Sequence, residues 1–138
     1  MRFLLDTNAV SEPARPQPDA GYAAWFADAP EADLFISVIT LGELRRGVAL
    51  LPDGARRRRY ESVNRELLVW FGDRVLSIDP DVAIVWGDLS ARHRSLGRRP
   101  ALADELVAAT ALAHDLVVVT RNVADFEHSG CKLLCPWT

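Results

Sequence analysis

The chain is poor in lysine, in cysteine and in long apolar runs. Lys132 is the only lysine among 16 basic residues, so arginine carries the other positive charges. Cys131 and Cys135 are the only cysteines, and on an extended strand they would lie about 13 Å apart, too far for a disulfide. A single C-x3-C pair is also a weak zinc signal, so we expect two free thiols.

Membrane-spanning and targeting segments are missing as well. No apolar run is long enough to span a bilayer, and residues 1–6 form no signal-peptide core. We therefore expect a cytoplasmic protein without a membrane partner. A chain of 138 residues can bury a real core, and we expect residues 1–138 to form a single domain.

The charge balance argues against one class of nucleic-acid-binding protein. The formal net charge is −3, whereas a protein that passively coats nucleic acid is normally basic. An enzyme that acts on nucleic acid is still allowed, because bound divalent cations reverse the local sign of charge at an acidic site.

Short apolar runs alternate with longer segments of helical periodicity, and their order predicts the fold class. Residues 11–18 contain three prolines and predict a turn or a short broken helix. Continuous apolar strands that alternate with helices are typical of a parallel sheet covered on both faces. We predict an α/β fold, a three-layer α/β/α sandwich with a central, mainly parallel sheet, whose strand order the pattern leaves open. Strands are expected at residues 3–5, 34–36, 74–78, 116–119 and 132–134, and helices at 19–29, 38–51, 55–71, from 79 to about 96, and 104–114.

Four acidic residues lie where such a sheet binds its ligands, at the edge beyond the carboxyl ends of the strands. Asp6 directly follows the first strand, and Asp125 lies a few residues past the fourth. Glu43 lies in the second turn of the helix that leaves the second strand. Asp104 begins the apolar helix before the fourth strand, a less direct position. Asp6 is the strongest candidate, because a carboxylate directly after an apolar strand is costly without a partner.

Four carboxylates at one edge would repel one another, and some would stay protonated. A divalent cation removes this problem, and a ligand set made only of oxygen favours Mg²⁺, with Mn²⁺ as a substitute. One or two such ions can bind a phosphodiester and lower the pKa of an attacking water. Thr7, Asn8 and Thr120 are candidates for the hydrogen bonds that hold the carboxylates in place.

The acids also have ordinary structural interpretations. Asp104 could cap its helix, because carboxylates in the first turn complement the helix dipole, and by the same reasoning Glu105 is expected to be a solvated neighbour. Glu43 could form a surface ion pair with Arg46. Asp125 alone could be a turn residue.

Four motifs that contain the acids occur in order along the chain. They are Leu-Leu-Asp-Thr-Asn at 4–8, Ile-Thr-Leu-Gly-Glu-Leu at 39–44, Asp-Glu-Leu-Val-Ala-Ala-Thr-Ala at 104–111, and Val-Thr-Arg-Asn at 119–122 with Asp-Phe at 125–126. Together they resemble the PIN-domain family, and the closest likeness is to the VapC toxins of bacterial type II toxin–antitoxin systems, including the FitB-like branch. The resemblance runs from Met1 to about Trp137, and the set of four motifs is specific although each motif alone is weak.

The resemblance implies a metal-dependent endoribonuclease. Asp6 and Asp104 would be the principal Mg²⁺ ligands, Glu43 and Asp125 would complete the acidic quartet, and Thr120 would orient the pocket. Family members cleave RNA, often transfer RNA or ribosomal RNA, usually as homodimers. A VapB-type antitoxin silences them by placing its tail in the site. The resemblance thus moves Asp104 from a possible cap into the site.

Two arginine clusters are left without an assigned role. Either cluster could contact the phosphates of RNA. A charge run is usually a solvated helix face, and we favour that interpretation for the first cluster. Both interpretations stay open for the second, which leads toward Asp104. The clusters are residues 56–59 and the set Arg92, Arg94, Arg98 and Arg99.

Other functional classes fit less well. A receiver-type phosphoacceptor domain needs a lysine near the site, and Lys132 is predicted in the last strand. A haloacid-dehalogenase-like phosphatase has Asp-x-Asp after the first strand, where this chain has Asp6, Thr7 and Asn8. A non-catalytic interaction protein that keeps the PIN fold is the remaining alternative, and the complete set of acids disfavours it, because unused buried acids only cost stability.

Overall fold

A five-stranded parallel sheet forms the centre of the protein, whose computed structural model describes residues 1–138. The strand order is β3-β2-β1-β4-β5, so the first strand of the chain lies in the middle. All four neighbouring pairs run parallel. The sequence predicted the parallel sheet but left this order open. The strands are β1 (Phe3–Leu5), β2 (Leu34–Ser37), β3 (Val75–Leu76), β4 (Val117–Val119) and β5 (Leu133–Leu134).

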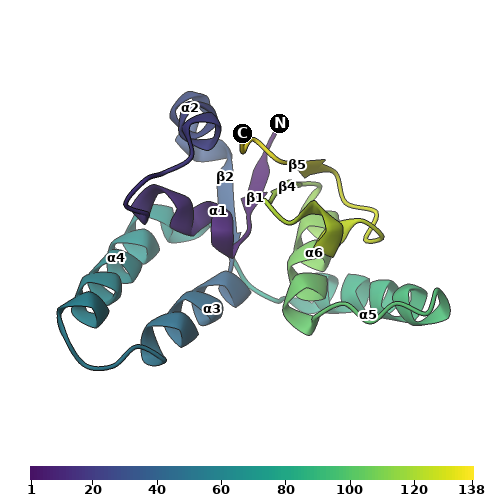
Figure 1. The fold of residues 1–138 in the computed structure, drawn as a ribbon. Helices are drawn as coiled ribbons and strands as arrows, with labels where there is room; N and C mark the ends of the chain where they lie inside the picture. The colour runs from purple at the N-terminus through teal and green to yellow at the C-terminus, as the bar shows by residue number, and fades with distance from the viewer.

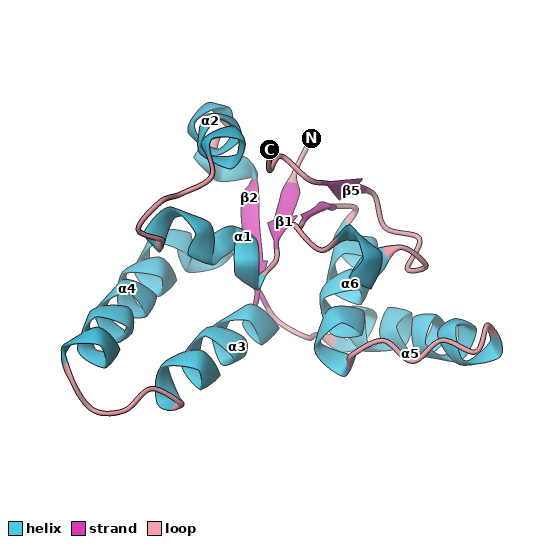
Figure 2. Cartoon of the chain, viewed as in Figure 1, coloured by secondary structure: helices cyan, strands magenta, loops and turns pink.

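Helices cover both faces of the sheet, which confirms the predicted three-layer sandwich (Figure 1, Figure 2). One side carries α1, α2 and α4, and the other carries α5 and α6. The α3 helix leaves the end of β2 and packs beside α4. The helices are α1 (Thr7–Ser11), α2 (Ala20–Asp28), α3 (Val38–Ala49), α4 (Ala55–Phe71), α5 (Pro80–Ser95) and α6 (Leu102–His114).

The central strands are buried on both faces because consecutive side chains of a strand point to opposite sides. Leu4 and Val118 pack with α5 and α6, whereas Leu5 and Val119 pack with α1, α2 and α4. All four side chains are fully buried. Burial on both faces explains why these strands are continuous apolar runs in the sequence.

The segment after β1 differs from the sequence prediction. The α1 helix begins at Thr7, directly after Asp6, and a 3₁₀ helix, η1 (Glu12–Ala14), follows it. The sequence had predicted a turn or broken helix only from residue 11. A helix begins earlier because the Asp6 carboxylate accepts a hydrogen bond from the Ala9 backbone N–H at 2.8 Å, which caps the first turn.

The last residues of the chain return to the start of α2. The Trp137 ring stacks on Tyr22 with the ring centroids 4.6 Å apart, and the Trp137 Nε1–H donates to Glu12 at 2.7 Å. Thr138 donates to Asp19 from its backbone N–H at 3.1 Å and from its hydroxyl at 2.9 Å. The tail is therefore fastened to the segment that follows α1.

Two further expectations concern the cysteines and the helices. Both cysteines are free, as predicted. The Cys131 thiol donates to the Ala108 carbonyl at 3.4 Å, and burial raises the pKa of this thiol.

None of the helices combines the length and the apolar character that a bilayer crossing requires.

Candidate active site

Asp6 lies at the carboxyl end of the central strand. Its backbone N–H donates to the Val119 carbonyl at 3.1 Å, which continues the pairing of β1 with β4. Its side chain is turned into the start of α1 and is 8% exposed. The sequence therefore placed this carboxylate correctly, directly past an apolar strand and largely out of solvent.

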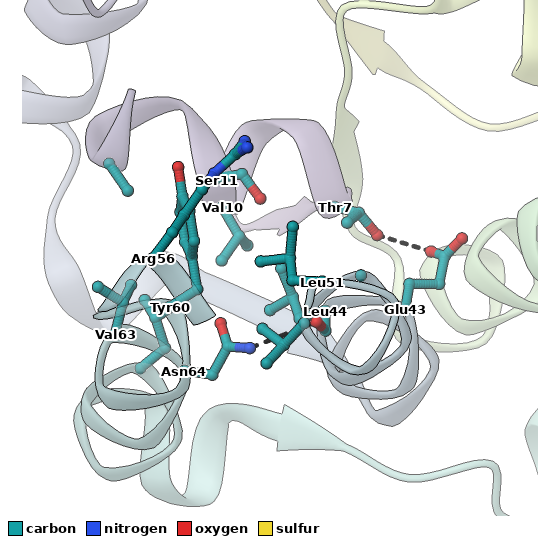
Figure 3. Close-up of a pocket in the computed structure, with 14 residues that line it drawn as sticks. Thr7, Val10, Ser11, Glu43, Leu44, Leu51, Arg56, Tyr60, Val63 and Asn64 are labelled. Carbon is teal, nitrogen blue, oxygen red and sulfur yellow. Dashed lines mark hydrogen bonds between the residues drawn. The ribbon is translucent and has the colours of Figure 1, made fainter. Parts of the chain in front are cut away.

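Glu43 reaches the same edge from α3. Ser37 ends β2 and caps α3 by accepting a hydrogen bond from the Ile39 N–H at 3.0 Å, so the helix starts at the sheet edge. The Thr7 hydroxyl donates to Glu43 Oε1 at 2.6 Å (Figure 3). Glu43 forms no ion pair with Arg46, and the surface-pair interpretation is wrong.

Asp104 and Asp125 come from the two segments on either side of β4. The α6 helix starts two residues before its predicted start, and its N-cap is Ala101, with no capping hydrogen bond from a side chain. Asp104 therefore supplies no N-cap hydrogen bond, but it does lie in the first turn of α6, where its charge complements the helix dipole as predicted. Asp125 lies in the 3₁₀ helix η4 (Val123–Phe126), where its N–H donates to the Asn122 carbonyl at 3.0 Å.

One hollow of about 260 Å³ collects the four carboxylates. Four separate segments meet at it: the end of β1 with the start of α1, the second turn of α3, the first turn of α6, and η4. We call it the acidic hollow. It is lined by Asp6, Thr7, Asn8, Glu43, Asp104, Val107, Asn122, Asp125 and Phe126.

The carboxylates of the acidic hollow disturb one another electrostatically. Burial, and then the negative charges of Asp125, Glu43 and Asp6 in that order, raise the pKa of Asp104 to about 6. Burial also raises the pKa of Asp6, and the charge of Glu43 adds to this effect. Hydrogen bonds to Asp6 from Thr120 and from the Ala9 N–H act in the opposite direction. The hollow thus has an excess of negative charge that a cation would relieve.

The three polar residues that were predicted to support the acids lie at or beside the hollow. Thr7 bonds to Glu43, and Thr120, which is fully buried after β4, bonds to Asp6. Asn8 lines the hollow, and its backbone N–H rather than its side-chain amide bonds to Asp6. Asn122 lines it too and was not singled out from the sequence, because nothing in a strand-to-turn segment marks which side chain turns inward.

The donor chemistry of the hollow suits a hard divalent cation. Every ionisable side chain that lines it is a carboxylate, as Mg²⁺ and Mn²⁺ prefer. As the side chains lie, no three acidic, histidine or cysteine groups form a closed set of metal ligands. A cation that keeps several of its waters needs only one or two protein carboxylates.

Glu105 corrects the sequence prediction. It was expected in solvent, but it is 7% exposed and bonds to His93 Nδ1 at 2.7 Å, and His93 is 4% exposed. The pair joins the end of α5 to the first turn of α6, next to Asp104. The sequence carried no signal for it, because the partners lie on different helices.

The two arginine clusters differ in their surroundings. In the first, Arg57 bonds to Glu61 at 3.1 Å, and Arg56 lies over the Tyr60 ring, which supports a solvated helix face. In the second, Arg92 donates to the Ser129 carbonyl at 2.7 Å. The remaining members of the second cluster form no ion pair.

A groove of about 280 Å³ runs between α1, α3 and α4 and ends at Glu43 (Figure 3). Eight of its 14 lining residues are hydrophobic, among them Val10, Leu51 and Val63. Figure 3 shows Arg56 at the end of the groove away from the acid. The groove therefore offers an apolar surface that leads from an arginine to one carboxylate of the acidic hollow.

Comparison with known proteins establishes the family. The PIN domain model matches residues 3–128, so this chain belongs to the PIN domain family, as the four motifs predicted. Toxin FitB of Neisseria gonorrhoeae is 38% identical to the chain, with 98% of both covered. VapC ribonuclease Y4jK of Sinorhizobium fredii is 37% identical, over 98% of this chain and 97% of the relative. The crystal structure of FitAcB from Neisseria gonorrhoeae matches with a TM-score of 0.90 at 38% identity, covering 98% of both chains.

Proposed function

We propose that this PIN-domain protein is a metal-dependent endoribonuclease and the toxin of a toxin–antitoxin pair. The acidic hollow, where Asp6, Glu43, Asp104 and Asp125 meet, carries the proposal. Asp6 is buried, Glu43 and Asp104 are half-buried, and Asp125 is exposed. Mutual repulsion among four such carboxylates costs stability unless a cation relieves it. Relatives named as a toxin and as a ribonuclease support RNA as the substrate class, with transfer RNA or ribosomal RNA as the expected targets.

The residues of the acidic hollow would have different roles in hydrolysis. Asp6 and Asp104 would hold Mg²⁺, or Mn²⁺ as a substitute, and the ion supplies positive charge at the phosphodiester and acidifies an attacking water. Glu43 and Asp125 orient that water and accept its proton while its oxygen bonds to phosphorus and the bond to the leaving oxygen breaks. Thr7 holds Glu43 in place through the 2.6 Å hydrogen bond.

The proposal is tested by sequencing RNA 5′ ends after induced expression of the wild type and of Asp6→Asn. New ends at a defined set of positions are expected with the wild type alone. Purified protein should cleave the same RNA, lose the activity in EDTA and regain it with Mg²⁺ or Mn²⁺. Full cleavage by Asp6→Asn, or cleavage that resists EDTA, contradicts the proposal and favours contamination or another catalytic centre.

The alternative functions have weaker support. A phosphoacceptor domain needs a lysine at the site, but Lys132 precedes β5 and so lies toward the amino end of that strand. A phosphatase of the Asp-x-Asp class would need a carboxylate at position 8, which is Asn8. A non-catalytic interaction protein would leave the repulsion around Asp104 without a use.

We further propose a VapB-type antitoxin as the partner, with a segment of it in the groove of Figure 3. A segment seated there would bury apolar side chains and end at Glu43, at the entrance to the acidic hollow. Leu51 lines the groove, whereas its neighbour Leu50 is 75% exposed and lies outside it. Leu51→Asp should therefore weaken binding of the antitoxin encoded beside the gene, and Leu50→Asp should not. Equal binding by both variants contradicts this assignment.

A homodimer is also proposed, on the family resemblance. Light scattering coupled to size exclusion, on the free protein and on the antitoxin complex, measures it directly. A mass of 15.3 kDa per particle for the free protein would contradict the dimer.

A further inference from the structure

A second pocket, of about 250 Å³, adjoins the acidic hollow. Asp104 and Asp125 line both cavities, so the two cavities are direct neighbours. The other side of the second pocket is basic, unlike anything in the hollow. We call it the basic pocket, and it is lined by His93, Arg98, Arg99, Pro100, Ala101, Asp104, Ala124, Asp125 and His128.

His93 is built into this pocket with one ring nitrogen held and the other free. Nδ1 is held by Glu105 at 2.7 Å, and the residue as a whole is 4% exposed. Nε2 has no hydrogen-bond partner in the protein. It is not completely buried either, because the only completely buried side-chain polar atoms without a partner are Thr40 Oγ1 and Trp86 Nε1. The free nitrogen therefore opens to the pocket that the ring lines.

The two arginines of the pocket are equally unpaired. Arg98 and Arg99 are exposed, and neither forms an ion pair or a side-chain hydrogen bond. The Arg98 backbone N–H donates to the His93 carbonyl at 2.8 Å, which fixes the arginines beside the imidazole. The start of α6 at Ala101 lacks a capping side chain, so the positive end of the helix also faces this region.

We propose that the basic pocket binds a backbone phosphate of the RNA next to the phosphate that is cleaved, with Arg98 and Arg99 as its ligands and His93 in the pocket wall beside them. This inference rests on the proposed ribonuclease function, because it assumes that RNA lies across the acidic hollow. Arginine forks suit phosphate oxygens. The basic pocket and the acidic hollow share two residues. An RNA chain with one phosphate in the hollow would therefore place the adjacent phosphate next to the two arginines.

A nucleic acid fits this site better than an acidic protein segment does. Asp104 and Asp125 stand at the pocket edge and repel any isolated anion. An RNA strand would be bound at two places, by the cation in the acidic hollow and by the arginines of the basic pocket. A single protein carboxylate in the basic pocket would be repelled by Asp104 and Asp125 and would gain no contact with the cation.

The experiment measures RNA binding in the cleavage-inactive Asp6→Asn background, with a fluorescently labelled single-stranded RNA 12-mer, at a series of salt concentrations. Arg98→Ala/Arg99→Ala removes the proposed contacts. Arg58→Ala/Arg59→Ala removes an equally exposed pair on α4 and is the matched control. Loss of one neutralised phosphate on a single strand should lower the salt slope by about 0.7, so a fourfold rise in salt weakens binding about 2.6-fold less. The control pair should keep the parental slope.

His93 gives a second readout, because it lines the pocket. The ¹⁵N resonance of His93 Nε2 is followed while the same RNA is added to the Asp6→Asn protein. The resonance should shift and saturate with the RNA, and the shift should be lost in the arginine double variant. A resonance that does not move means that the phosphate does not enter the pocket, which overturns the inference.

The outcomes separate this inference from the proposed function. An unchanged salt slope in Arg98→Ala/Arg99→Ala overturns the phosphate site, even if the wild type cleaves RNA. A lowered slope in a protein that never cleaves RNA overturns the nuclease proposal and leaves the phosphate site standing. An unchanged RNA slope with weaker antitoxin binding assigns the basic pocket to the protein partner, which also overturns the inference.

Discussion

Two sets of carboxylates in this protein lie in opposite electrostatic environments. Glu12 is only 3% exposed, yet its pKa is lowered, first by the hydrogen bond from Trp137. Asp19 also has a lowered pKa, chiefly because it accepts the Tyr22 N–H. In the acidic hollow the pKa of Asp104 is raised to about 6 by burial and by its acidic neighbours.

Burial acts to raise the pKa of each of these carboxylates, and the groups that surround each one decide whether this effect is offset. Around Glu12 the chain supplies donors, namely the Trp137 indole and the Asp19 backbone N–H, with the Arg15 guanidinium 3.5 Å away. Around Asp104 it supplies further negative charges. A carboxylate that accepts hydrogen bonds from its own chain stabilises the fold. A carboxylate surrounded by other negative charges is stabilised only when a cation binds beside it.

The largest expected effect separates the two sets by activity. Asp104→Asn should lower RNA cleavage by about three orders of magnitude, because it removes a carboxylate that would hold the cation, and the cation would compensate the negative charge of the transition state. Glu12→Gln should leave cleavage per folded molecule within about threefold of wild type, since removing a distant hydrogen bond leaves transition-state contacts intact. Initial rates on one RNA substrate, with the folded fraction measured by circular dichroism, give the comparison. Equal losses in both variants would mean that Glu12 is part of the site.

The second effect separates the sets by stability. Glu12→Ala should lower the free energy of unfolding by about 3 kcal/mol, because it leaves the Trp137 indole and the Asp19 N–H without their acceptor. Asp104→Asn should leave stability unchanged or raised at neutral pH, since it relieves repulsion. Urea denaturation of both variants measures this. A loss of stability in Asp104→Asn as large as that in Glu12→Ala would contradict the distinction.

The pH dependence of stability should have opposite signs in the two sets. For Asp104 the folded pKa of about 6 exceeds the reference value of 3.8, so its contribution to stability is present below pH 3.8 and is lost as pH rises through 6. For Glu12 the folded pKa lies below 4.5, so its contribution is present above pH 4.5 and is lost as pH falls through the folded pKa. Because Asp104 is partly exposed, we expect its share to be about 1 kcal/mol.

Mg²⁺ should cancel the Asp104 effect but not the Glu12 effect. An ion in the hollow favours ionised carboxylates, so it should lower the pKa of Asp104 and raise the melting temperature at pH 7. Carboxyl ¹³C titrations with and without Mg²⁺, and melting curves of Asp104→Asn, check this. Two results would argue against a cation held by Asp104. One is a wild-type melting temperature that does not change with Mg²⁺, and the other is an Asp104→Asn melting temperature that rises with Mg²⁺ as much as that of the wild type.

The same two sets show what the sequence could and could not predict. Asp6 was predictable, because a strand end and an apolar run locate it on the sheet edge. Glu12 was not, since the prolines after it predicted a turn and its partner Trp137 lies 125 residues further along the chain. Glu105 was predicted wrongly, because the preference for acids in a first helical turn says nothing of a histidine on a neighbouring helix.

The order of the strands shows the same limit at the level of the fold. Each strand was visible as an apolar run, but a run that is buried on both faces carries no mark of its neighbours. Only the packing places β1 between β2 and β4. That placement brings the ends of β1, β2 and β4 together, and with them Asp6, Glu43 and Asp125, which topology alone had grouped at one edge without fixing their contacts.

The smallest expected effect disturbs the Glu12 set without changing any carboxylate. At Gly21 an added Cβ would lie 2.3 Å from Thr138 Cγ2 and 2.7 Å from the Pro136 carbonyl oxygen, so Gly21→Ala must displace the tail. We expect a loss of about 1 kcal/mol, part of the cost of overpacking being offset by the better helix propensity of alanine. Gly87→Ala in α5 meets nothing within 4 Å and should instead gain up to about 1 kcal/mol.

If hydrogen bonds from the tail set the low pKa of Glu12, Gly21→Ala should raise that pKa toward 4.5 while RNA cleavage stays unchanged. A carboxyl ¹³C titration of Glu12 in Gly21→Ala and Gly87→Ala makes the comparison. A low pKa that survives in Gly21→Ala would shift the cause to the remaining contacts, the Asp19 N–H and the Arg15 guanidinium, both of which lie within the segment itself. In that case the tail would pack on Glu12 without controlling its charge, and the contrast with Asp104 would rest on local chain geometry alone.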